Sequence, residues 1–393
     1  MLDDDFDVLI IGGGIAGAAL ASRIAAVRRV GVLEMEEQPG YHSTGRSAAV
    51  YVEGYGNPVI RSLTRASREF FFSPPSQFTE ERLVAPRQVL IFGRTDRREA
   101  FEAFLDQHLP SPHLELVDAQ TAVALCPVLR SDGLLGAVVD NGAADVEVHT
   151  LHQAYLRQFN RRGGRVLLQS RVEAITYAAD GRWVLTTPQG SCRAKVIVNA
   201  AGAWADEVAR MAGARPVGIE PRRRTAALIE PPEGVSAESW PMIVDADETF
   251  YMKPDAGLLL ISPADETLST PADAQPEDLD IAIAADRAET FTTLKVNRIK
   301  GKWAGLRTFV SDRSPVVGFD DASPGFFWMA ALGGYGIQTA PALSALAAKL
   351  LLETLTARDL GTFDFNLADI SPARCASGSS AKTAALPRLA AGQ

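Results

Sequence analysis

The chain opens on apolar runs separated by a glycine-rich turn. In DVLIIGGGIAGAALASRIAAVRRVGVLE, the apolar positions predict a strand over residues 7–11, a helix of small residues from 15 to about 26, and a second strand over 30–33. A strand, a helix and a second strand in this order form one βαβ unit. The acidic residue Glu34 follows the second strand directly.

The turn inside this unit carries glycines at the spacing G-x-G-x-x-G. Gly12 suits a tight turn, Gly14 lets the backbone approach a pyrophosphate, and Gly17 lets the helix pack closely on the strand. Glu34, twenty residues after Gly14, can accept hydrogen bonds from ribose hydroxyls. Glycines, strand, helix and acid together predict a bound dinucleotide; the alternative is a glycine-rich turn without a ligand.

Past residue 60 the apolar runs become shorter and proline-rich breaks such as SPPSQF and LPSPHL interrupt them, which predicts a departure into a second domain. The chain then returns. A meander turned at Asp180–Gly181 and Gln189–Gly190 leads into an apolar strand over 195–198. That strand ends in Asn199–Gly202, where small residues let a nucleotide approach the sheet.

A second excursion, from about residue 215 to 308, holds further strand-like pieces, and the glycine cluster GGYGIQT then precedes the last long helix. The nucleotide-binding domain is therefore predicted to be discontinuous. The predicted division is a first domain over 1–60, 145–215 and 310–370, a second domain over 61–144 and 216–309, and a loose C-terminal tail of small and polar residues over 371–393.

Composition narrows the choice of partners. In 393 residues, 39 basic and 48 acidic side chains give a formal net charge of −9, which disfavours binding to nucleic acid. The cysteines Cys126, Cys192 and Cys375 lie far apart in the sequence and are predicted to be inert thiols. His149 and His152 would share a helix face but lack a supporting carboxylate or cysteine cluster, so no metal site is predicted.

The N-terminal residues MLDDDFD are acidic where an export signal is basic, and glycines soon interrupt the apolar segment that follows. The most apolar late segment, ALSALAAKLLLETL, contains a lysine and a glutamate and is too short to cross about 30 Å of hydrocarbon. We expect a cytoplasmic protein without a transmembrane segment, either free or peripheral to the inner face of a membrane.

The identity of the dinucleotide follows from what accompanies the glycine turn. The sequence has neither a second mononucleotide-binding half nor a second glycine fingerprint with a cysteine pair. Instead, the polar loop GYHSTGRSAA follows Glu34, and the late glycine cluster leads into a helix N-terminus. Backbone N–H groups at such a terminus stabilise negative charge, which a reduced flavin develops on its pyrimidine side. These features favour FAD.

Five longer stretches, QPGYHSTGRSAA, RPVGIEPRRRTA, WPMIVDADETFYMKPDAG, WAGLRTF and GGYGIQT, resemble the FAD-dependent D-amino-acid oxidase superfamily. Within it, the chain is similar to bacterial D-arginine dehydrogenases up to about residue 370. The resemblance implies an α/β plus α+β fold. A discontinuous FAD-binding Rossmann domain of the glutathione-reductase type would be joined to a substrate domain whose mostly antiparallel sheet lies over the isoalloxazine.

The resemblance also indicates how FAD is held. Members with covalent flavin attach it through a cysteine near the late arginine, and GLRTFVSDRSP contains none, so we expect non-covalent FAD. The residues expected to bind it lie in the glycine turn, after the second strand, in the polar loop, at two later strand ends and in the late glycine cluster: Gly12, Gly14, Ile15, Ala16, Gly17, Glu34, Met35, Ser43, Thr44, Gly45, Arg46, Ser47, Ala48, Val172, Ala201, Gly202, Trp204, Gly333, Gly334, Tyr335, Gly336, Ile337 and Gln338.

Arg307 stands in the nearly apolar run WAGLRTF, so it is exposed, paired with a carboxylate such as Asp312, or kept for a ligand. The resemblance implies that Arg307 binds the α-carboxylate of the substrate, helped by Arg224, Tyr55 and Tyr251. A planar guanidinium offers two parallel donors to a carboxylate. The alternatives are a solvated basic face for the arginine run at 222–224 and a core role for both tyrosines.

The predicted side-chain pocket is apolar. Val50 and Val89 stand where the arginine-specific enzymes carry a histidine and a glutamate, so a guanidinium in this pocket would lose its counter-charge. Arginine is therefore expected to be a poor substrate, and hydrophobic D-amino acids are expected to be better ones. The alternative is that these valines are core residues. The full predicted pocket is Val50, Val52, Val89, Met242, Val244 and Gly334.

The function predicted from the resemblance is FAD-dependent oxidative deamination of D-amino acids. Hydride would pass from Cα to the flavin, and the imino acid would hydrolyse to a 2-oxo acid and ammonia. The motifs leave the electron acceptor open between oxygen and a quinone-like carrier. Two alternatives remain: a secondary-amine oxidase of the sarcosine or glycine type, and a tRNA-modification flavoprotein, which the negative charge disfavours.

Overall fold

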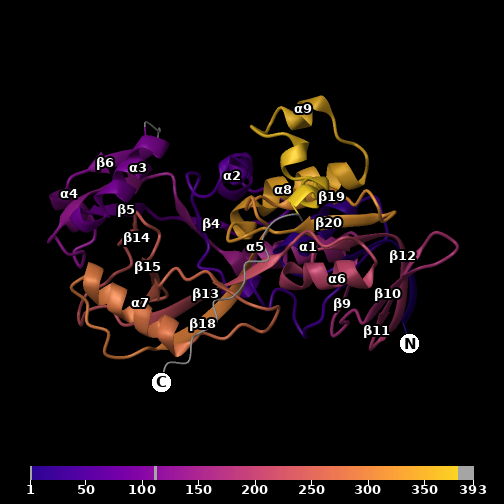
Figure 1. Ribbon diagram of the computed structural model, residues 1–393, viewed down its shortest axis with the longest axis horizontal. Helices are drawn as coiled ribbons and strands as arrows, with labels where there is room; N and C mark the ends of the chain where they lie inside the picture. The colour runs from indigo at the N-terminus through magenta and orange to yellow at the C-terminus, as the bar shows by residue number, and fades with distance from the viewer. Residues whose placement is uncertain (1, 110–112, 379–393) are drawn as a thin grey trace, which may run out of the picture.

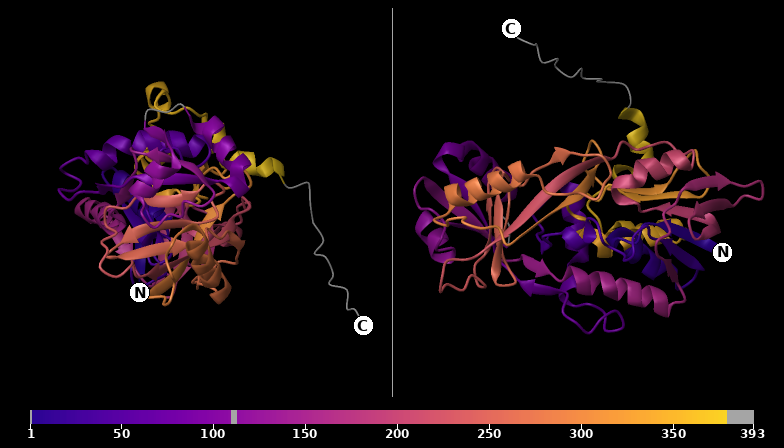
Figure 2. Two further views of the ribbon diagram at one scale, coloured as in Figure 1. Left: turned by 90° about the vertical axis from the view of Figure 1, so that its left-hand side faces the viewer. Right: turned by 90° about the horizontal axis from the view of Figure 1, so that it is seen from below.

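The computed structural model describes residues 2–109 and 113–378, which form two lobes, each built on a large β-sheet (Figure 1). The lobes lie side by side along the long axis of the molecule (Figure 2). One lobe has a mainly parallel sheet with helices on its faces, and the other has a mostly antiparallel sheet. The predicted fold class, a Rossmann-type α/β domain joined to an α+β domain, is confirmed.

Among the described residues, the first sheet has eight strands: β1 (Leu2–Ile11), β2 (Val30–Leu33), β9 (Arg165–Leu167), β10 (Ala174–Tyr177), β11 (Trp183–Thr187), β12 (Gly190–Asn199), β19 (Val316–Phe319) and β20 (Phe326–Ala330). The parallel part has the order β9-β2-β1-β12-β20. β2 is buried at every position, as expected for a parallel strand covered on both faces. β10 and β11 form the predicted meander against the first half of β12.

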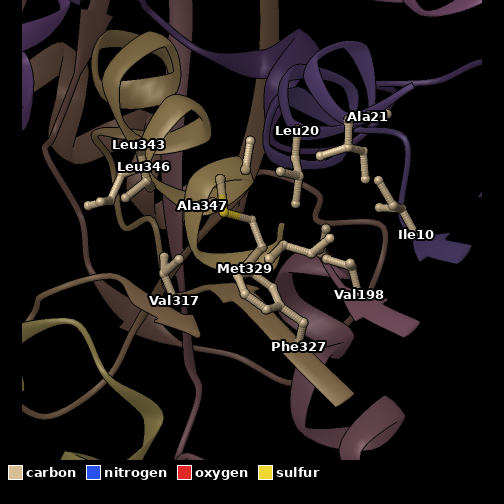
Figure 3. Packing of buried hydrophobic residues seen from close by; sticks show 14 of the residues in the cluster. Ile10, Leu20, Ala21, Val198, Val317, Phe327, Met329, Leu343, Leu346 and Ala347 are labelled. Atoms are coloured by element: carbon tan, nitrogen blue, oxygen red, sulfur yellow. The ribbon is translucent and has the colours of Figure 1, made fainter. Parts of the chain in front are cut away.

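Helices cover both faces of this sheet: α1 (Ile15–Ile24), α2 (Pro58–Phe72), α5 (Val148–Arg161), α6 (Ala205–Met211) and α8 (Gly336–Leu351). Because side chains alternate along a strand, Val8 and Ile10 of β1 pack with α1 and α8, whereas Leu9 and Ile11 pack with α6. Figure 3 shows the first of these layers, in which Ile10 lies near Leu20 of α1. The apolar pattern of β1 thus fixes both layers of the lobe.

The structure differs from the predicted domain boundary at residue 60. The Asn57 side chain accepts a hydrogen bond from Ile60 N at 3.0 Å, and Pro58 occupies the first helical position, so α2 begins there. Val59 and Leu63 of α2 join the same core as α8. The elements of the first lobe therefore continue to the end of α2. The rest of the predicted division into domains stays a prediction.

Within the same described ranges, the second sheet has nine strands: β5 (Val89–Arg94), β6 (Leu114–Val117), β7 (Leu134–Asp140), β13 (Glu220–Ile229), β14 (Met242–Asp245), β15 (Tyr251–Asp255), β16 (Leu258–Ser262), β17 (Thr267–Leu268) and β18 (Gly301–Phe309). Neighbouring strands are antiparallel except for β14 with β5. Leu90 and Phe92 face a core formed with α4 (Ala119–Leu125) and α7 (Asp278–Phe291). Val89 and Ile91 alternate with them and face the opposite side, which α3 (Arg98–His108) borders.

The remaining elements are short. A small sheet has the order β3-β8-β4, and short helices occur in several loops. None of the helices in the described ranges has the length and apolar content needed to cross a bilayer. These elements are β3 (Val50–Tyr51), β4 (Val84–Pro86), β8 (Ala144–Val146), α9 (Ala357–Leu360) and the 3-10 helices η1 (Thr44–Arg46), η2 (Thr95–Arg97), η3 (Gly202–Trp204), η4 (Leu367–Asp369) and η5 (Pro372–Gly378).

The start of the predicted loose tail is ordered. Residues 372–378 form η5, and Arg374 Nε donates a hydrogen bond to Asp312 Oδ2 at 2.7 Å. An ion pair and a helical turn therefore hold a segment whose small and polar composition predicted none. The rest of the predicted tail, residues 379–393, lies outside the described residues.

Candidate active site

Two cavities meet at the face shared by the lobes. The first cavity, of about 240 Å³, is lined by the glycine turn, Glu34 and η1. The second cavity, of about 490 Å³, is lined by the β5–β14 side of the second sheet and by α3. Seven of the described residues line both cavities and mark their junction: Ser47, Ala48, Arg224, Tyr251, Arg307, Gly334 and Ile337.

The glycine turn has the geometry that its spacing predicted. Gly12 has a φ of +105°, and a Cβ there would lie 2.4 Å from the Ala200 carbonyl oxygen. A Cβ on Gly17 would lie 2.0 Å from the Gly12 oxygen, so Gly17 packs beneath the turn and does not line the first cavity. Gly14 does line it. The turn therefore leaves backbone surface open to a ligand.

Glu34 fixes the same turn. Its Oε2 accepts a hydrogen bond from Gly13 N at 2.9 Å, and its Oε1 accepts one from Glu36 N at 3.0 Å. Burial raises the pKa of the Glu34 carboxyl, and these backbone hydrogen bonds only partly offset the rise. On the other side of the turn, His152 Nε2 donates to the Gly13 oxygen at 2.8 Å. The predicted ribose acceptor thus lines the cavity and also shapes it.

Most of the predicted FAD-binding residues line the first cavity, and besides Gly17 three do not. Gly45 donates its N–H to the Gly40 oxygen at 2.8 Å and forms part of a turn. Tyr335 and Gln338 line the second cavity, where the Gln338 amide holds the Val52 backbone. Tyr335 and Gln338 lie in or beside the glycine cluster, and their sequence positions did not reveal that they line the second cavity and not the first.

Arg46 lines the first cavity, but its guanidinium donates hydrogen bonds to other groups of the protein. Nη1 donates to the Ala274 and Ala304 oxygens at 2.9 and 3.0 Å, and Nη2 pairs with Asp273. Trp303 Nε1 in turn donates to the Arg46 oxygen at 3.1 Å. Arg46 therefore joins the wall of the first cavity to the second sheet.

Two helix N-termini open on the first cavity, and this arrangement fits FAD. α1 begins at Ile15 and α8 at Gly336, both of which line the cavity, and neither helix has a side-chain cap or an acidic residue in its first turn. The positive ends of the two helix dipoles favour the pyrophosphate and the negative charge of a reduced flavin. Thr44 Oγ1 accepts from Ile15 N at 3.0 Å and completes this end of α1.

Strand register explains how the three arginines of β13 differ. Arg224 lies opposite Gly305 and Arg222 lies opposite Arg307, so Arg224 and Arg307 share one face of the sheet. Arg223 points to the other face and pairs with Asp280 of α7 at 2.9 Å. The alternative of a common solvated basic face is therefore wrong for Arg224, which lines both cavities.

Arg307 makes no ion pair within 4.0 Å in the part of the chain that the structure describes. Its Nη1 donates to the Tyr55 hydroxyl at 3.5 Å. Burial lowers the pKa of this guanidinium, but Tyr55 and Tyr251 raise it by more, so the group is charged. The suggested partner Asp312 is bound by Arg374 instead. Among the described residues, Arg307 therefore has a hydroxyl partner but no carboxylate within 4.0 Å.

The glycine cluster presses against this arginine. Gly333 N donates to the Thr308 oxygen at 2.8 Å, which ties the loop after β20 to β18. A Cβ on the next residue, Gly334, would lie 2.7 Å from Arg307 Cζ and Nη1. Only glycine fits at Gly334 without displacing the guanidinium.

Tyrosines surround the arginine pair. Tyr55 packs edge-on against Tyr335 with ring centroids 5.0 Å apart, and Tyr251 is buried with the Arg224 Cζ 6.0 Å from its ring centroid. Burial raises the pKa of Tyr335 to about 12, so its hydroxyl stays protonated at neutral pH. The predicted Tyr55 and Tyr251 are therefore beside the arginines, and Tyr335 is a third hydroxyl that sequence reasoning assigned to the cofactor.

All six residues predicted for the side-chain pocket line the second cavity. Val89 and Met242 are direct partners across the parallel β5–β14 pair, which explains why both face the same space. Sequence reasoning missed the opposite wall, where Ala103 and Phe104 of α3 line the cavity. The available signal was a phenylalanine, Phe104, in a segment of mostly polar residues, and its side chain is half-buried in the structure.

Backbone strain gathers at the cavities. In the described part of the chain, eight non-glycine residues have a positive φ, and five of them line one of the two cavities. A left-handed backbone costs such a residue on the order of 1–3 kcal/mol, and strained residues are concentrated at functional sites. The five residues are Ala49, Glu248, Ala264, Arg313 and Ala331.

The first cavity lies at the carboxyl ends of the parallel strands, beside a glycine turn and an acid that faces it. This arrangement defines a dinucleotide-binding protein of the Rossmann type. No group of three metal-ligating side chains occurs within residues 2–109 and 113–378. The second cavity adds a charged, tyrosine-lined site that adjoins the first cavity.

Comparison with known proteins identifies the family. A model of the FAD dependent oxidoreductase family, DAO, matches residues 7–350. The chain belongs to this family, and its cofactor is FAD. The expected superfamily is thus confirmed, whereas the expected similarity to bacterial D-arginine dehydrogenases stays a prediction.

Individual relatives are distant. Glycine oxidase of Pseudomonas aeruginosa is 26% identical over 365 residues, which cover 88% of this chain and 94% of that protein. Mitochondrial dimethylglycine dehydrogenase of Rattus norvegicus is 24% identical over 269 residues, 66% of this chain but 31% of that protein. The chain thus spans about a third of the length of the dimethylglycine dehydrogenases that it matches.

Solved structures share the fold. The glycine oxidase of Geobacillus kaustophilus has a TM-score of 0.80 at 21% identity and covers 94% of this chain and 98% of its own. The L-proline dehydrogenase of P. horikoshii also has a TM-score of 0.80, at 19% identity, and covers 95% of this chain and 98% of its own. At such identities the likeness extends to the fold alone.

Proposed function

We propose that this protein oxidises the carbon–nitrogen bond of an amino acid whose carboxylate is bound by Arg307. One observation carries the proposal: Arg307 is a charged guanidinium at the junction of the two cavities, and no carboxylate of the described residues lies within 4.0 Å of it. A half-buried cation without a counter-ion is costly unless a ligand supplies one. The anion must also lie within reach of the flavin in the first cavity.

The surrounding residues have complementary roles in this proposal. Arg224 shares a sheet face with Arg307, and its Nε and Nη2 are used by Asp265 and Glu266, which leaves Nη1 for the substrate. Tyr55 and Tyr251 would donate hydroxyl hydrogen bonds to the carboxylate. Two guanidiniums and two hydroxyls would hold the substrate in one orientation, and such positioning supplies much of the rate in reactions of this kind.

FAD, when bound, supplies the two-electron acceptor for the hydride that leaves the carbon beside the amine. The first cavity would hold it through the glycine turn, Glu34, η1 and the N-termini of α1 and α8. No general base is required of the chain if the amine is neutral when it reacts. The imine that results hydrolyses in water to an oxo acid and ammonia, or to an amine if the nitrogen carries a substituent.

The relatives favour glycine, sarcosine and cyclic or N-methylated amino acids as substrates, because glycine oxidase, dimethylglycine dehydrogenase and L-proline dehydrogenase are among them. The second cavity favours a second candidate, D-amino acids with apolar side chains. Its volume of about 490 Å³ is larger than glycine or sarcosine would fill. Its apolar wall, formed by Val50, Val89, Met242 and Val244, suits an apolar side chain. D-Arginine, the substrate of the dehydrogenases that the motifs resemble, would meet two valines in place of a counter-charge.

An anaerobic substrate panel tests the proposal. Glycine, sarcosine, L-proline, D-leucine, D-phenylalanine and D-arginine would each be mixed with the FAD-loaded protein while flavin absorbance is followed. We expect bleaching by one of the two candidate classes and little by D-arginine. Bleaching by none of these compounds would contradict the proposal and favour a non-catalytic flavoprotein.

A substitution gives the matching control. Arg307→Met should lower kcat/KM by about 100-fold or more, because it removes the group that orients the carboxylate. Arg222→Met on the neighbouring strand should change it little, since Arg222 pairs with Glu220 and lines neither cavity. Full turnover by the Arg307 variant would refute the assignment. Repeating the active reaction in air identifies whether oxygen accepts the electrons.

A further inference from the structure

One carboxylate is shared between two arginines at the edge of the second cavity. Glu266 accepts two hydrogen bonds from Arg313, Nη2 to Oε1 at 2.8 Å and Nη1 to Oε2 at 3.0 Å. The contact from Arg224 Nη2 to Oε1 is longer, at 3.4 Å. Arg313 therefore has the bidentate geometry that binds a carboxylate best, and Arg224 is held only at one edge.

Arg313 is fixed in this position by its surroundings. Its backbone has a φ of +60°, and its Cζ lies 3.9 Å from the centroid of the Phe309 ring. Left-handed backbone is unfavourable for arginine, so these interactions must hold the strained conformation in place. The exposed fraction of the side chain falls from 41% for Arg313 to 29% for Glu266 and 12% for Arg224. The more exposed arginine, Arg313, therefore makes the two shorter hydrogen bonds to the Glu266 carboxylate.

Glu266 is a charged group. Burial raises the pKa of its carboxyl, but the hydrogen bonds and charge of Arg313 and the charge of Arg224 lower it by more, so the pKa lies below its usual value. Without Arg313, this charge would have Arg224 as its remaining close partner. A closer Arg224–Glu266 pair would neutralise the guanidinium and bring a negative charge toward the site of the substrate carboxylate.

We propose that Arg313 is a positioning residue that holds Glu266 away from Arg224 and so keeps the charge of Arg224 available to the substrate carboxylate. The inference rests on the proposed function, because it needs a carboxylate bound at Arg307 and Arg224. It assigns to a residue outside the predicted site an influence on substrate affinity that acts through Glu266. Arg313 itself need not touch the substrate.

The test uses benzoate, a carboxylate without an amine, and the best substrate from the panel. Arg313→Met in the FAD-loaded protein should weaken benzoate binding, followed by the flavin spectrum, by about tenfold, and should raise KM more than it lowers kcat. The double variant with Glu266→Gln should recover most of the wild-type affinity, since a neutral amide cannot neutralise Arg224. Arg313→Lys, which keeps charge without the fork, should be intermediate.

Glu248 supplies the matched control. It lines the second cavity and faces Arg224, Arg307 and Arg313, but it makes no ion pair within 4.0 Å among the described residues. Adding Glu248→Gln to Arg313→Met should therefore restore less binding than adding Glu266→Gln, because Glu248 forms no ion pair with Arg224. Equal recovery by both glutamine substitutions would overturn the inference in favour of a net-charge effect.

Further outcomes separate this inference from the function on which it rests. Wild-type protein that binds benzoate as tightly as Arg313→Met does would overturn the inference alone. Wild-type protein that neither binds benzoate nor reacts with the panel would overturn the proposed function as well. If Arg313→Met folds poorly, as judged by its flavin content and unfolding temperature, the same comparison is made with Arg313→Gln. Rescue by Glu266→Gln distinguishes a positioning role from a structural one in either background.

Discussion

At the scale of single residues, the contact with Gly334 limits where the Arg307 guanidinium can lie. A Cβ on Gly334 would lie 2.7 Å from the guanidinium carbon, so Gly334→Ala must push Arg307 away from its position. We expect kcat/KM to fall by roughly 10- to 100-fold, because a displacement of about 1 Å at a binding group has effects of this size. Steady-state kinetics with the best panel substrate would measure it.

Gly361→Ala is the control for this substitution. Gly361 has a helical backbone, with φ −63° and ψ −6°, and a Cβ there would meet nothing closer than 3.5 Å. Its alanine variant should keep its activity and lose no stability. Equal activity of the two alanine variants would show that the guanidinium can move without consequence.

Individual site residues could be found from sequence where a motif surrounds them. Arg307, Gly12 and Gly14 were found in this way, and they line the cavities. Arg224 was uncertain because three arginines in a row look alike until strand register divides them between two faces. Arg313 was missed altogether, since its significance depends on Glu266, which lies 47 residues earlier. Such a pair exists only after folding.

At the scale of elements, glycines have two different roles in the N-terminal strand–turn–helix unit: Gly17 allows α1 to pack on the turn, and Gly14 lines the first cavity. Gly17→Ala would place a Cβ 2.0 Å from the Gly12 backbone oxygen, so α1 cannot pack on the turn. We expect this variant to be insoluble or to unfold at a much lower temperature. Gly14→Ala would place a Cβ 3.2 Å from the movable Thr44 Oγ1 and should fold but bind FAD more weakly.

The ratio of flavin to protein after purification, together with the unfolding temperature, distinguishes the two glycine variants. The prediction fails if Gly17→Ala is as stable as the wild type. It fails equally if Gly14→Ala retains FAD with unchanged affinity, because the backbone there would then not approach the pyrophosphate.

The same turn should respond to pH through His152. Burial lowers the pKa of His152, and the hydrogen bond to the Gly13 oxygen only partly offsets this. An unfolded histidine has a pKa of about 6.5, so below that value the unfolded chain binds more protons than the folded one. Stability is therefore expected to fall as the pH drops through about 6.5, by up to about 1.4 kcal/mol per pH unit.

Unfolding temperatures and flavin retention at about pH 7.5 and about pH 5.5 would measure this effect. His152→Gln should be less stable at the higher pH but lose less on acidification. Replacement of the exposed His149, one turn away on α5, should change the slope only slightly, because its charge is the smallest of the causes that lower the pKa of His152. An equally steep decline in the His152 variant would assign the pH dependence to other groups.

Elements were predictable where local pattern decides them. The four-residue strand β2 and the meander of β10 and β11 match the expectation closely. The domain boundary predicted at residue 60 falls inside α2, because the sequence analysis did not identify the helix that Asn57 caps. α3 begins four residues after β5 and packs against it, but the second cavity also needs β14, which lies far along the chain and leaves no local signal.

At the scale of the whole molecule, a buried ion pair connects the sheets. Lys253 of β15 donates to Asp145 of β8 at 2.7 Å and to the Ala48 oxygen at 3.1 Å, and its side chain is 7% exposed. Asp145 also accepts from Arg87 Nε at 2.8 Å. Lys253→Met should lower the free energy of unfolding by about 2–4 kcal/mol, since it removes one partner of a buried pair.

Denaturant unfolding, with flavin release followed in parallel, would measure this loss. Lys302→Met is the control, because Lys302 pairs with a fully exposed Asp278 and should matter little. Since Ala48 lines both cavities, the Lys253 variant should release FAD before it unfolds globally. Simultaneous loss of flavin and structure would contradict that part of the prediction.

The overall architecture was predictable because each lobe has a recognisable type of sheet, one parallel and one antiparallel. What could not be predicted is how the lobes adjoin. The junction of the cavities is formed by residues just after η1, by residues of β13, β15 and β18, and by residues in the loop before α8 and at its start. These segments are distant in sequence, and no periodicity links them.

The first cavity is assembled from segments that run from Ile11 to Ile337. Synthesis must therefore have passed Ile337 before the nascent polypeptide can complete the cavity for its cofactor, and the pairing of β1 with β12 already spans a long stretch of chain. A nascent chain that stops short of α8 is thus expected to bind FAD poorly, however much FAD surrounds it.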